Sequence, residues 1–258
     1  MTKNYFKTTV QKNKQISDNL FTLYLKSPHI ARESKPGQFI NIYFQNTLKI
    51  FPRPFSISQI VDNQILIRYE VIGTQTKKMS KWAPGREIKI MGPLGNSFDI
   101  PSEVNSHILV AGGIGIAPLF FLRDNLYDKG ENIYFFSGAH TETKHYIKND
   151  NKSKFYLATD DGSLGYHGNV VELLKENISD IPSPSIIYSC GPEPMLKSLK
   201  NYSQDQNIEL KISMEKIMGC GQGLCQGCAI EAKAPEQAYW LVCKDGPVFN
   251  SKDIIINV

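Results

Sequence analysis

Long hydrophobic runs are scarce in this sequence of 258 residues. The longest, ILVAGGIGIAPLFFL from Ile108 to Leu122, is short for a membrane span and is interrupted by three glycines and a proline. The N-terminal stretch MTKNYFKTTV has no apolar core behind its lysines, so it lacks the features of a signal peptide. We therefore expect a cytoplasmic protein with no membrane partner.

A strong excess of charge of either sign is also absent. The formal net charge is +4, which is too small to indicate nucleic acid as a partner. The charge is unevenly distributed, because residues 1–99 hold 15 Lys/Arg against 6 Asp/Glu, while residues 100–258 hold 14 against 19. The basic first part would attract an anionic cofactor, although a solvated basic face explains the same excess.

Cysteine is scarce except near the C-terminus. Only five cysteines occur, and four of them lie beyond residue 217. In a reducing compartment such cysteines are free thiols that can bind metals, and a disulfide-stapled secreted domain is not indicated. The five histidines show no metal-ligand spacing with a carboxylate partner, and internal repeats and low-complexity segments are absent.

The sequence up to about residue 99 has the pattern of a small antiparallel barrel. Short runs rich in β-branched and aromatic residues are separated by the turns KPGQ, VDNQ, APGR and GPLGN. A helical insert is predicted over Thr76–Trp82. The predicted strands are Phe21–Ser27, Phe39–Phe44, Pro54–Ile60, Ile65–Ile72 and Glu87–Gly92.

From about residue 105 strands alternate with helices, beginning with the buried strand His107–Gly113, and this alternation predicts a doubly wound parallel sheet. Residues beyond about 217 show little periodicity and are expected to form a separate small module. The predicted fold class is α+β multidomain. Its parts are a β-barrel over residues 1–101, an α/β domain over 102–214 and a cysteine-bearing module over 215–258.

Two glycine-bearing turns follow predicted strands of the α/β part. AGGIGIAP joins a strand to a helix, where glycine permits close backbone approach and the helix start offers free N–H groups to an anion. Its pattern only approximates the dinucleotide fingerprint, and a tight turn without a ligand would use the same residues. CGPEPM follows a later strand, and ligands bind outside such strand ends. The candidate residues are Gly112, Gly113, Gly115, Ala117, Pro118, Cys190, Gly191 and Pro192.

A third motif, RPFSIS, begins at Arg53, whose planar guanidinium can pair with a pyrophosphate. In this order and spacing, RPFSIS, GGIGIAP and CGPEPM resemble the ferredoxin–NADP reductase superfamily, which joins an FAD-binding barrel to a pyridine-nucleotide domain. The resemblance covers residues 1 to about 215. It implies that FAD is contacted by Arg53, Pro54, Phe55, Ser56, Tyr69, Glu70, Val71, Gln75 and Thr76.

Two positions depart from the pattern of this superfamily. Glu70 stands where a basic residue is expected, and Gln75 stands where glycine is expected. FSGAHTETK after the second strand of the α/β part has no arginine for a 2′-phosphate, which favours NAD over NADP, with Lys144 as the remaining basic residue.

The segment GCGQGLCQGC raises the question of a metal site. Cys220, Cys225, Cys228 and Cys243 have the spacing C-x4-C-x2-C-x14-C, whose first intervals are those of plant-type [2Fe–2S] ferredoxins. Zinc is the competing interpretation, but zinc sites usually take two CxxC-like pairs. Interleaved glycines would let backbone N–H groups reach the sulfurs, so the pattern favours the cluster.

The segments EKIMGCGQGLCQGCAI and VCKDGPVF resemble the electron-transfer subunits of NAD-dependent dihydroorotate dehydrogenases. The resemblance implies an FMN-containing catalytic partner chain in a heterotetramer of two plus two. Electrons would pass from the partner's flavin through [2Fe–2S] and FAD to NAD, in pyrimidine biosynthesis. Hydride transfer would take place near Ser56 and Cys190, and no general acid or base is expected in this chain.

Two alternative functions and one related branch are consistent with part of these motifs. A flavin and iron–sulfur reductase serving another oxidoreductase usually has a longer chain or a linked ferredoxin domain. A redox sensor or zinc-stabilised interaction module would not require intact flavin and nucleotide motifs. The small subunits of ferredoxin-linked NADH:NADP transhydrogenases tend to have aspartate at the first cysteine position, and Cys220 argues against that branch.

Overall fold

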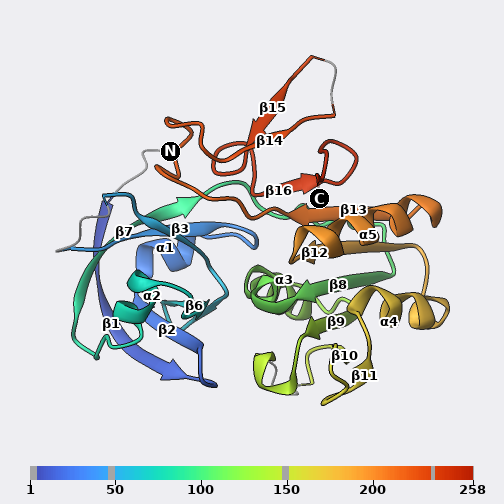
Figure 1. Cartoon of the computed structure of the whole chain (residues 1–258), viewed down its shortest axis with the longest axis horizontal. Coiled ribbons are helices and arrows are strands. Elements are labelled where there is room, and N and C mark those ends of the chain that lie inside the picture. The colour runs from blue at the N-terminus through green and yellow to red at the C-terminus, as the bar shows by residue number, and fades with distance from the viewer. Residues whose placement is uncertain (1–4, 46–49, 147–150, 234–235, 258) are drawn as a thin grey trace.

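The computed structural model describes residues 5–45, 50–146, 151–233 and 236–257. In Figure 1 the chain forms two lobes side by side, with the C-terminal segment lying across the top of both. Among the described residues, no helix has the length and apolar character needed to cross a membrane.

The first lobe is an antiparallel sheet of seven strands in the order β4-β3-β7-β1-β2-β6-β5. Its elements are β1 (Tyr5–Gln15), β2 (Leu20–Lys26), α1 (Pro28–Glu33), β3 (Phe39–Tyr43), β4 (Arg53–Ser56), β5 (Gln59–Val61), β6 (Gln64–Glu70), α2 (Thr74–Met79) and β7 (Glu87–Leu94). Alternate residues of the strands, such as Leu23 and Leu25, are fully buried and pack inside the curled sheet.

The segment after β4 closes this sheet into a barrel. Ile57 N–H donates to Gln38 C=O beside β3, and Ser58 N–H donates to Leu66 C=O of β6, so both edges are joined. The predicted strand Pro54–Ile60 is therefore wrong as one strand, because residues 57 and 58 separate β4 from β5. The alternating pattern runs through this corner, and periodicity alone could not detect it.

The second lobe is a sheet in the order β11-β10-β9-β8-β12-β13-β16. Its elements are β8 (Ser106–Gly112), α3 (Ile116–Asp128), β9 (Ile133–Ala139), β10 (Lys154–Thr159), β11 (Tyr166–His167), α4 (Val170–Asn177), β12 (Ser185–Cys190), α5 (Glu193–Asp205), β13 (Glu209–Ser213) and β16 (Val248–Asn250), with short 3-10 turns at 113–115, 142–144 and 178–180. Pairing is parallel from β11 to β13. The alternation of strands and helices therefore produces the predicted parallel sheet.

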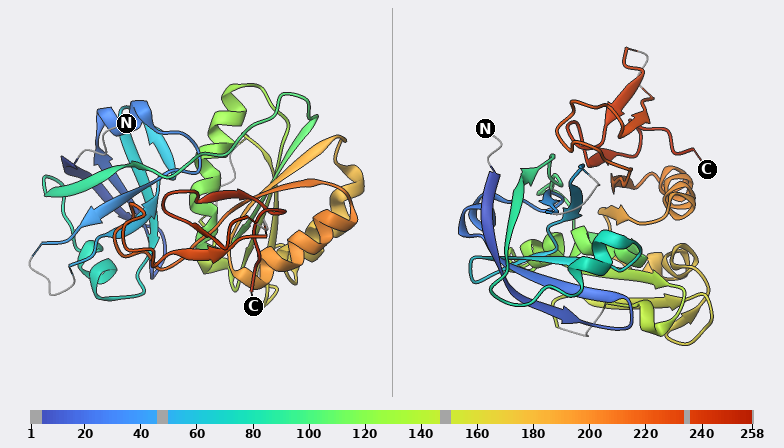
Figure 2. Two further views of the ribbon diagram at one scale, coloured as in Figure 1. Left: turned by 90° about the horizontal axis from the view of Figure 1, so that it is seen from above. Right: turned by 60° about the vertical axis from the view of Figure 1, so that its left-hand side comes forward.

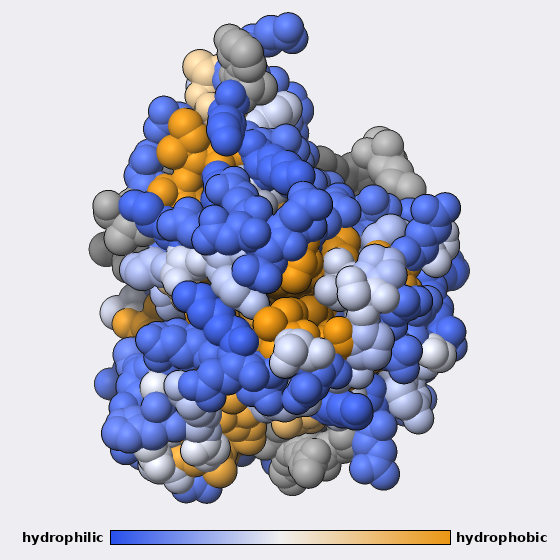
Figure 3. Space-filling view, turned by 90° about the vertical axis from the view of Figure 1, so that its right-hand side faces the viewer, coloured by the Kyte–Doolittle hydropathy of each residue, from blue (hydrophilic) through white to orange (hydrophobic). Residues whose placement is uncertain are grey.

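Helices cover both faces of this second sheet. Leu119 and Leu122 of α3 pack with Leu109 on one face. Leu174 of α4 and Leu199 of α5 belong to the core cluster of the opposite face. Figure 2 shows α3 next to the barrel, so this helix lies between the two lobes. The outer side of the second lobe is mainly hydrophilic, with apolar side chains gathered near its centre (Figure 3).

The C-terminal segment is attached to both lobes. It contains a short hairpin of β14 (Ala229–Glu231) and β15 (Tyr239–Leu241), while β16 pairs antiparallel with β13 and so extends the second sheet. Asn96, just after the barrel, donates to the backbone carbonyls of Asp245 (3.0 Å) and Val248 (2.7 Å). These contacts fix the cysteine-bearing segment against the rest of the molecule.

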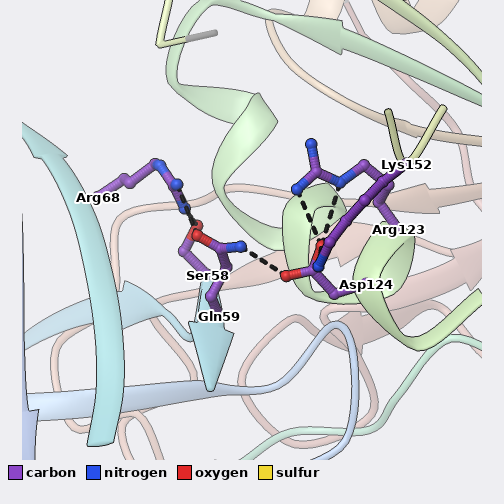
Figure 4. A network of polar contacts seen from close by, with 6 residues as sticks. All are labelled: Ser58, Gln59, Arg68, Arg123, Asp124 and Lys152. Atoms are coloured by element: carbon purple, nitrogen blue, oxygen red, sulfur yellow. Dashed lines mark hydrogen bonds and ion pairs between the residues drawn. The ribbon is translucent and has the colours of Figure 1, made fainter. Parts of the chain in front are cut away.

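A polar network joins the lobes, and Figure 4 shows its members. Arg68 donates to Ser58 Oγ (2.5 Å) and Gln59 Oε1 (2.7 Å), both within the barrel. Gln59 Nε2 then donates to Asp124 Oδ2 on α3 (2.5 Å). Asp124 also pairs with Arg123 and Lys152. The barrel and the second lobe are therefore connected by hydrogen bonds between side chains as well as by packing.

Candidate functional site

The RPFS motif forms strand β4, at the closing edge of the barrel. Its residues pair with β3, with Phe39 opposite Ser56 and Ile42 opposite Arg53. All four residues of the motif are partly exposed, which leaves side-chain surface available to a ligand. Arg53 Nη1 lies 3.5 Å from Pro52 C=O, and Phe55 packs edge-on against Tyr69 with 6.2 Å between ring centroids. The motif is therefore accessible on a rigid strand.

Tyr69 is buried in the barrel core, unlike the motif beside it. Its hydroxyl donates to Asn13 Oδ1 (3.1 Å), and burial raises the pKa of Tyr69 to about 12 despite that bond. Its backbone carbonyl accepts a hydrogen bond from Tyr146 of the second lobe (2.7 Å). The side chain of Tyr69 packs in the core, so contact between this residue and a flavin would come from its backbone. Val71 lies just after the last residue of β6.

Glu70 and Lys144 form an ion pair between the lobes. This pair accounts for one departure from the superfamily pattern, because the carboxylate of Glu70 neutralises a lysine rather than facing a phosphate. It also engages Lys144, the one basic residue that the sequence left for a 2′-phosphate.

Gln75 and Thr76 lie inside α2, because this helix begins at Thr74, two residues before the predicted start. Thr76 Oγ1 accepts hydrogen bonds from the N–H groups of Ile72 and Gly73, both at 3.1 Å. Gln75 is buried, and its Oε1 accepts from Thr74 Oγ1 (3.0 Å). Both side chains are thus bonded to their own turn of the chain, and their contact with FAD stays a prediction.

The two glycine-bearing turns of the second lobe touch each other. Strands β8 and β12 are neighbours, with Ala111 opposite Cys190. A Cβ on Gly115 would lie 2.2 Å from Cys190 O, and a Cβ on Gly112 would lie 2.7 Å from Pro192 Cδ. Only glycine permits this approach of two backbones. The turns form one continuous surface at the C-terminal strand ends, the place where such sheets bind ligands.

The remaining candidates occupy the flanks of this surface. Gly113 has φ +54°, a conformation that favours glycine, while Ala117 and Pro118 begin helix α3 and are buried. Gly191 packs against the backbone of Gly112.

Cys190 is fully buried at the end of β12. Its Sγ lies 3.8 Å from Glu215 Oε1. Burial, followed by the charge of Glu215, raises the pKa of Cys190, so its thiol stays protonated at neutral pH. Burial of the carboxyl likewise raises the pKa of Glu215, although the residue as a whole keeps solvent exposure. Glu215 begins the segment EKIMGCGQGLCQGCAI, but no motif indicated that its carboxyl lies beside Cys190, a contact formed where the chain leaves β13.

The four C-terminal cysteines form two pairs. Cys220 N–H donates to Cys225 Sγ (3.5 Å), and Cys225 N–H donates to Cys220 Sγ (3.4 Å). In the other pair, Cys243 N–H donates to Cys228 Sγ (3.4 Å). Among the described residues, no three His, Cys, Asp or Glu side chains are arranged to hold a single metal ion. Four cysteines are the ligand set of a [2Fe–2S] cluster, in which each of the two irons is bound by two thiolates.

Backbone N–H groups also favour the thiolate that an iron–sulfur cluster requires. Gln222 N–H donates to Cys220 Sγ (3.4 Å), and Gly223 N–H donates to Cys243 Sγ (3.1 Å). Burial would raise the pKa of Cys220, but the N–H groups of Cys225 and Gln222 outweigh it and hold the pKa at about 7. Cys243 has its pKa raised to about 12 by burial and by Cys228. Four cysteine sulfurs, with backbone N–H groups directed at them, therefore fit a [2Fe–2S] cluster.

The cysteine loop lies against the flavin-motif strand and its neighbour. Asn41 of β3 donates through Nδ2 to Cys220 C=O (3.1 Å). A Cβ on Gly219 would lie 3.2 Å from Cys225 Sγ and 3.5 Å from Phe51 Cε1, just before β4. A cluster held by these cysteines would be adjacent to the edge of the barrel where RPFS is exposed. Sequence reasoning missed Asn41, which no motif includes.

Comparison with known families gives two matches. The family model described as "Oxidoreductase FAD-binding domain" matches residues 7–98. The model described as "Iron-sulfur cluster binding domain of dihydroorotate dehydrogenase B" matches residues 215–255 and contains all four paired cysteines.

Curated relatives match over nearly the whole chain. The "Dihydroorotate dehydrogenase B (NAD(+)), electron transfer subunit" of Caldanaerobacter subterraneus subsp. tengcongensis is 34% identical, over 96% of this chain and 98% of the relative. The protein of the same name from Clostridium acetobutylicum is also 34% identical, over 100% of both chains.

Solved structures share the fold. A structure of the NADH-dependent reduced ferredoxin-NADP oxidoreductase superposes with a TM-score of 0.85 at 25% identity, covering 96% of this chain and 90% of the other. A ferredoxin NADP+ reductase from Neisseria gonorrhoeae with bound FAD and NADP superposes with a TM-score of 0.66 at 16% identity, covering 78% and 91%. The second likeness concerns the fold alone.

Proposed function

This chain belongs to the family of dihydroorotate dehydrogenase B electron transfer subunits, and from that premise we propose that it conveys electrons from dihydroorotate oxidation on a partner chain to NAD, by way of a [2Fe–2S] cluster and FAD. One observation supports this most directly. The loop that carries the cysteine pairs contacts Asn41 of β3 and approaches Phe51, two residues before the exposed flavin motif of β4. The two redox groups would therefore be neighbours.

Bound FAD would supply the chemistry that joins one-electron transfer to hydride transfer, because a flavin can hold one or two electrons. The chain supplies the binding surfaces. Arg53 is the cation for the diphosphate, and β4 presents Phe55 and Ser56 from an edge strand paired with β3. Cys190 adds no negative charge at this strand end, because burial raises the pKa of its thiol and keeps it protonated.

We propose NAD rather than NADP as the nucleotide. The continuous surface of the Gly112–Gly115 and Cys190–Pro192 turns is its binding site at the strand ends. Lys144, the basic residue nearest in sequence to the expected 2′-phosphate position, is paired with Glu70. A 2′-phosphate would have to compete with that carboxylate.

The proposal includes an FMN-containing catalytic partner in a two-plus-two assembly. Four exposed apolar side chains lie in the cysteine-bearing segment or in the segment that Gly219 approaches: Ile50, Phe51, Ile217 and Leu224, with exposures of 82%, 50%, 91% and 80%. Large apolar side chains exposed together suit a protein interface.

We also propose a division of the chain into three parts, at residues 1–101, 102–214 and 215–258. We also propose a cytoplasmic location, where cysteines stay reduced and available as cluster ligands.

Affinity purification of the tagged chain from its native cells tests the function. We expect the eluate to show flavin and iron–sulfur absorbance and to reduce NAD when dihydroorotate is added. A coloured eluate that oxidises NADH with dyes but ignores dihydroorotate would instead support a reductase for another oxidoreductase. An eluate containing zinc and no flavin would contradict the proposal entirely.

A Cys225→Ser variant tests the place of the cluster in this route. We expect loss of cluster absorbance and of dihydroorotate-dependent NAD reduction, while NADH oxidation by an artificial dye persists, because Cys225 lies outside the nucleotide turns. Cys190→Ser is the matched control for the cluster, since this fifth cysteine is paired with Glu215 and should leave cluster absorbance intact. Loss of both activities in Cys225→Ser would indicate a structural metal.

A further inference from the structure

Asn41 is a buried polar side chain that connects the barrel to the cysteine loop. It has 0% exposure within β3. Its Nδ2 donates to Cys220 C=O at 3.1 Å, across 179 residues of sequence. Because a carbonyl can only accept, the amide nitrogen must face the loop. Asn41 Oδ1 is buried and finds no hydrogen-bond partner among the described residues. Burying an amide costs free energy unless its polar atoms are hydrogen-bonded, so the bond from Nδ2 to the loop offsets part of that cost.

The loop closes tightly on this side chain. A Cβ on Gly221 would lie 2.3 Å from Asn41 Nδ2, and Gly221 has φ +68°. The next two residues, Gln222 and Gly223, supply the N–H groups that donate to Cys220 Sγ and Cys243 Sγ. The direction of these two N–H groups therefore depends on where the Cys220–Gly221 peptide is held, and Asn41 holds it.

Asn41 also belongs to the strand that carries the flavin motif as its neighbour. In the β3–β4 ladder Asn41 lies opposite Pro54, between the pairs Ile40–Phe55 and Ile42–Arg53. The same residue thus contacts the peptide of a cysteine ligand and pairs with the middle of RPFS. Side chains of ordinary core residues on β3, such as Ile40 and Ile42, make only apolar contacts.

We propose that Asn41 is a positioning residue for the cluster, an inference that rests on the proposed function. It fixes the Cys220–Gly223 turn so that two backbone N–H groups point at cysteine sulfurs, and it holds this turn against the flavin strand. N–H donors to sulfur stabilise the more negative, reduced cluster and raise its reduction potential. Removing the Asn41 bond should therefore make the cluster harder to reduce.

The test compares Asn41→Leu, Asn41→Asp and Asn96→Leu in the full-length chain carrying FAD and cluster. Leucine keeps the approximate volume without a donor, whereas aspartate keeps the shape, cannot donate and adds negative charge. Asn96→Leu is the control, because Asn96 also ties the barrel to the C-terminal segment, through Asp245 and Val248, but contacts no cysteine. The measurements are the midpoint potential in a redox titration and the electron paramagnetic resonance spectrum of the reduced cluster.

We expect a lower midpoint potential in both Asn41 variants, with the larger shift in Asn41→Asp. At the potential where the wild-type cluster is half reduced, the ratio of reduced to oxidised cluster should fall about fivefold in Asn41→Leu, the effect of roughly one hydrogen bond. The resonance spectrum should also change, while Asn96→Leu should match the wild type in both measurements. If Asn41→Leu does not fold, Asn41→Ala decides the question, because alanine also lacks the donor and adds no charge that would shift the potential by itself.

Unchanged potentials in the Asn41 variants, or an equal shift in Asn96→Leu, would overturn the inference and leave the proposed function in place. A wild-type chain that shows no cluster signal would overturn both. The two failures are therefore distinguishable from the wild-type spectrum alone.

Discussion

At the scale of single residues, the charged side chains near the flavin motif differ in whether they have hydrogen-bond or ion-pair partners within the protein. Glu70 is neutralised by Lys144, and Arg68 is bonded to Ser58 and Gln59. Arg53 is partly exposed, and within the described part of the chain its guanidinium has only a 3.5 Å contact with Pro52 C=O. A cation held on a rigid strand without a carboxylate partner is suited to a ligand's phosphate.

Replacing Arg53 with alanine should therefore weaken FAD binding. A hydrogen bond to a charged group contributes about 1.5–3 kcal/mol, which corresponds to a roughly 10- to 100-fold rise in the dissociation constant of FAD. Flavin fluorescence released on dilution would measure it. Arg32→Ala is the control, because Arg32 is an exposed arginine of the same lobe paired with its neighbour Glu33. Equal FAD retention in both variants would show that Arg53 does not bind the cofactor.

At the scale of elements, the strand–turn–helix units were predictable from sequence. The buried run that predicts a strand over His107–Gly113 forms β8 at Ser106–Gly112, because a continuous apolar run followed by glycine suits a parallel strand with both faces covered. The separation of β4 from β5 was missed, since hydrogen bonds to Gln38 and Leu66 create it. β16 was missed because it has three residues and exists through its pairing with β13.

Only part of the candidate site was likewise predictable from the sequence. Glycines and cysteines can be found from spacing, because their chemistry requires those residue types at those intervals. The contacts of Asn41 with Cys220 and of Glu215 with Cys190 were not predicted, because they join residues 179 and 25 positions apart and local sequence patterns carry no record of such contacts.

The turn between β8 and α3 yields a prediction at this scale. In Gly115→Ala the new methyl group would meet Cys190 O at 2.2 Å and Gly191 N at 2.7 Å, both backbone atoms that cannot rotate away. We expect the two turns to separate, with a loss of about 1–3 kcal/mol in the free energy of unfolding and weaker NADH binding. Urea unfolding and NADH titration would measure both. Gly73→Ala is the stability control, because a Cβ there meets nothing within 4 Å.

At the scale of the whole molecule, charged and polar side chains in the interface fix the orientation of the two lobes relative to each other. Arg68 stacks over Phe120 of α3 with its guanidinium carbon 4.1 Å from the ring centroid. Burial, and after it the nearby charge of Arg123, lowers the pKa of Arg68 to about 10, so the group is still cationic at neutral pH. Gln59 is central to this arrangement, because it accepts from Arg68 and donates to Asp124. These contacts fix the orientation of the two lobes relative to each other.

A double-mutant cycle between Gln59→Ala and Asp124→Ala should measure this connection. Because the two side chains are in direct contact across the interface, their effects on the free energy of unfolding should be non-additive by about 1–2 kcal/mol. Urea unfolding of the four chains gives the coupling. The control cycle pairs Gln64→Ala with Asp124→Ala, since Gln64 lies on β6 of the same sheet and pairs with Lys26 and Val61. Additive behaviour in the Gln59 cycle, to within about 0.5 kcal/mol, would mean that packing alone sets the orientation of the lobes.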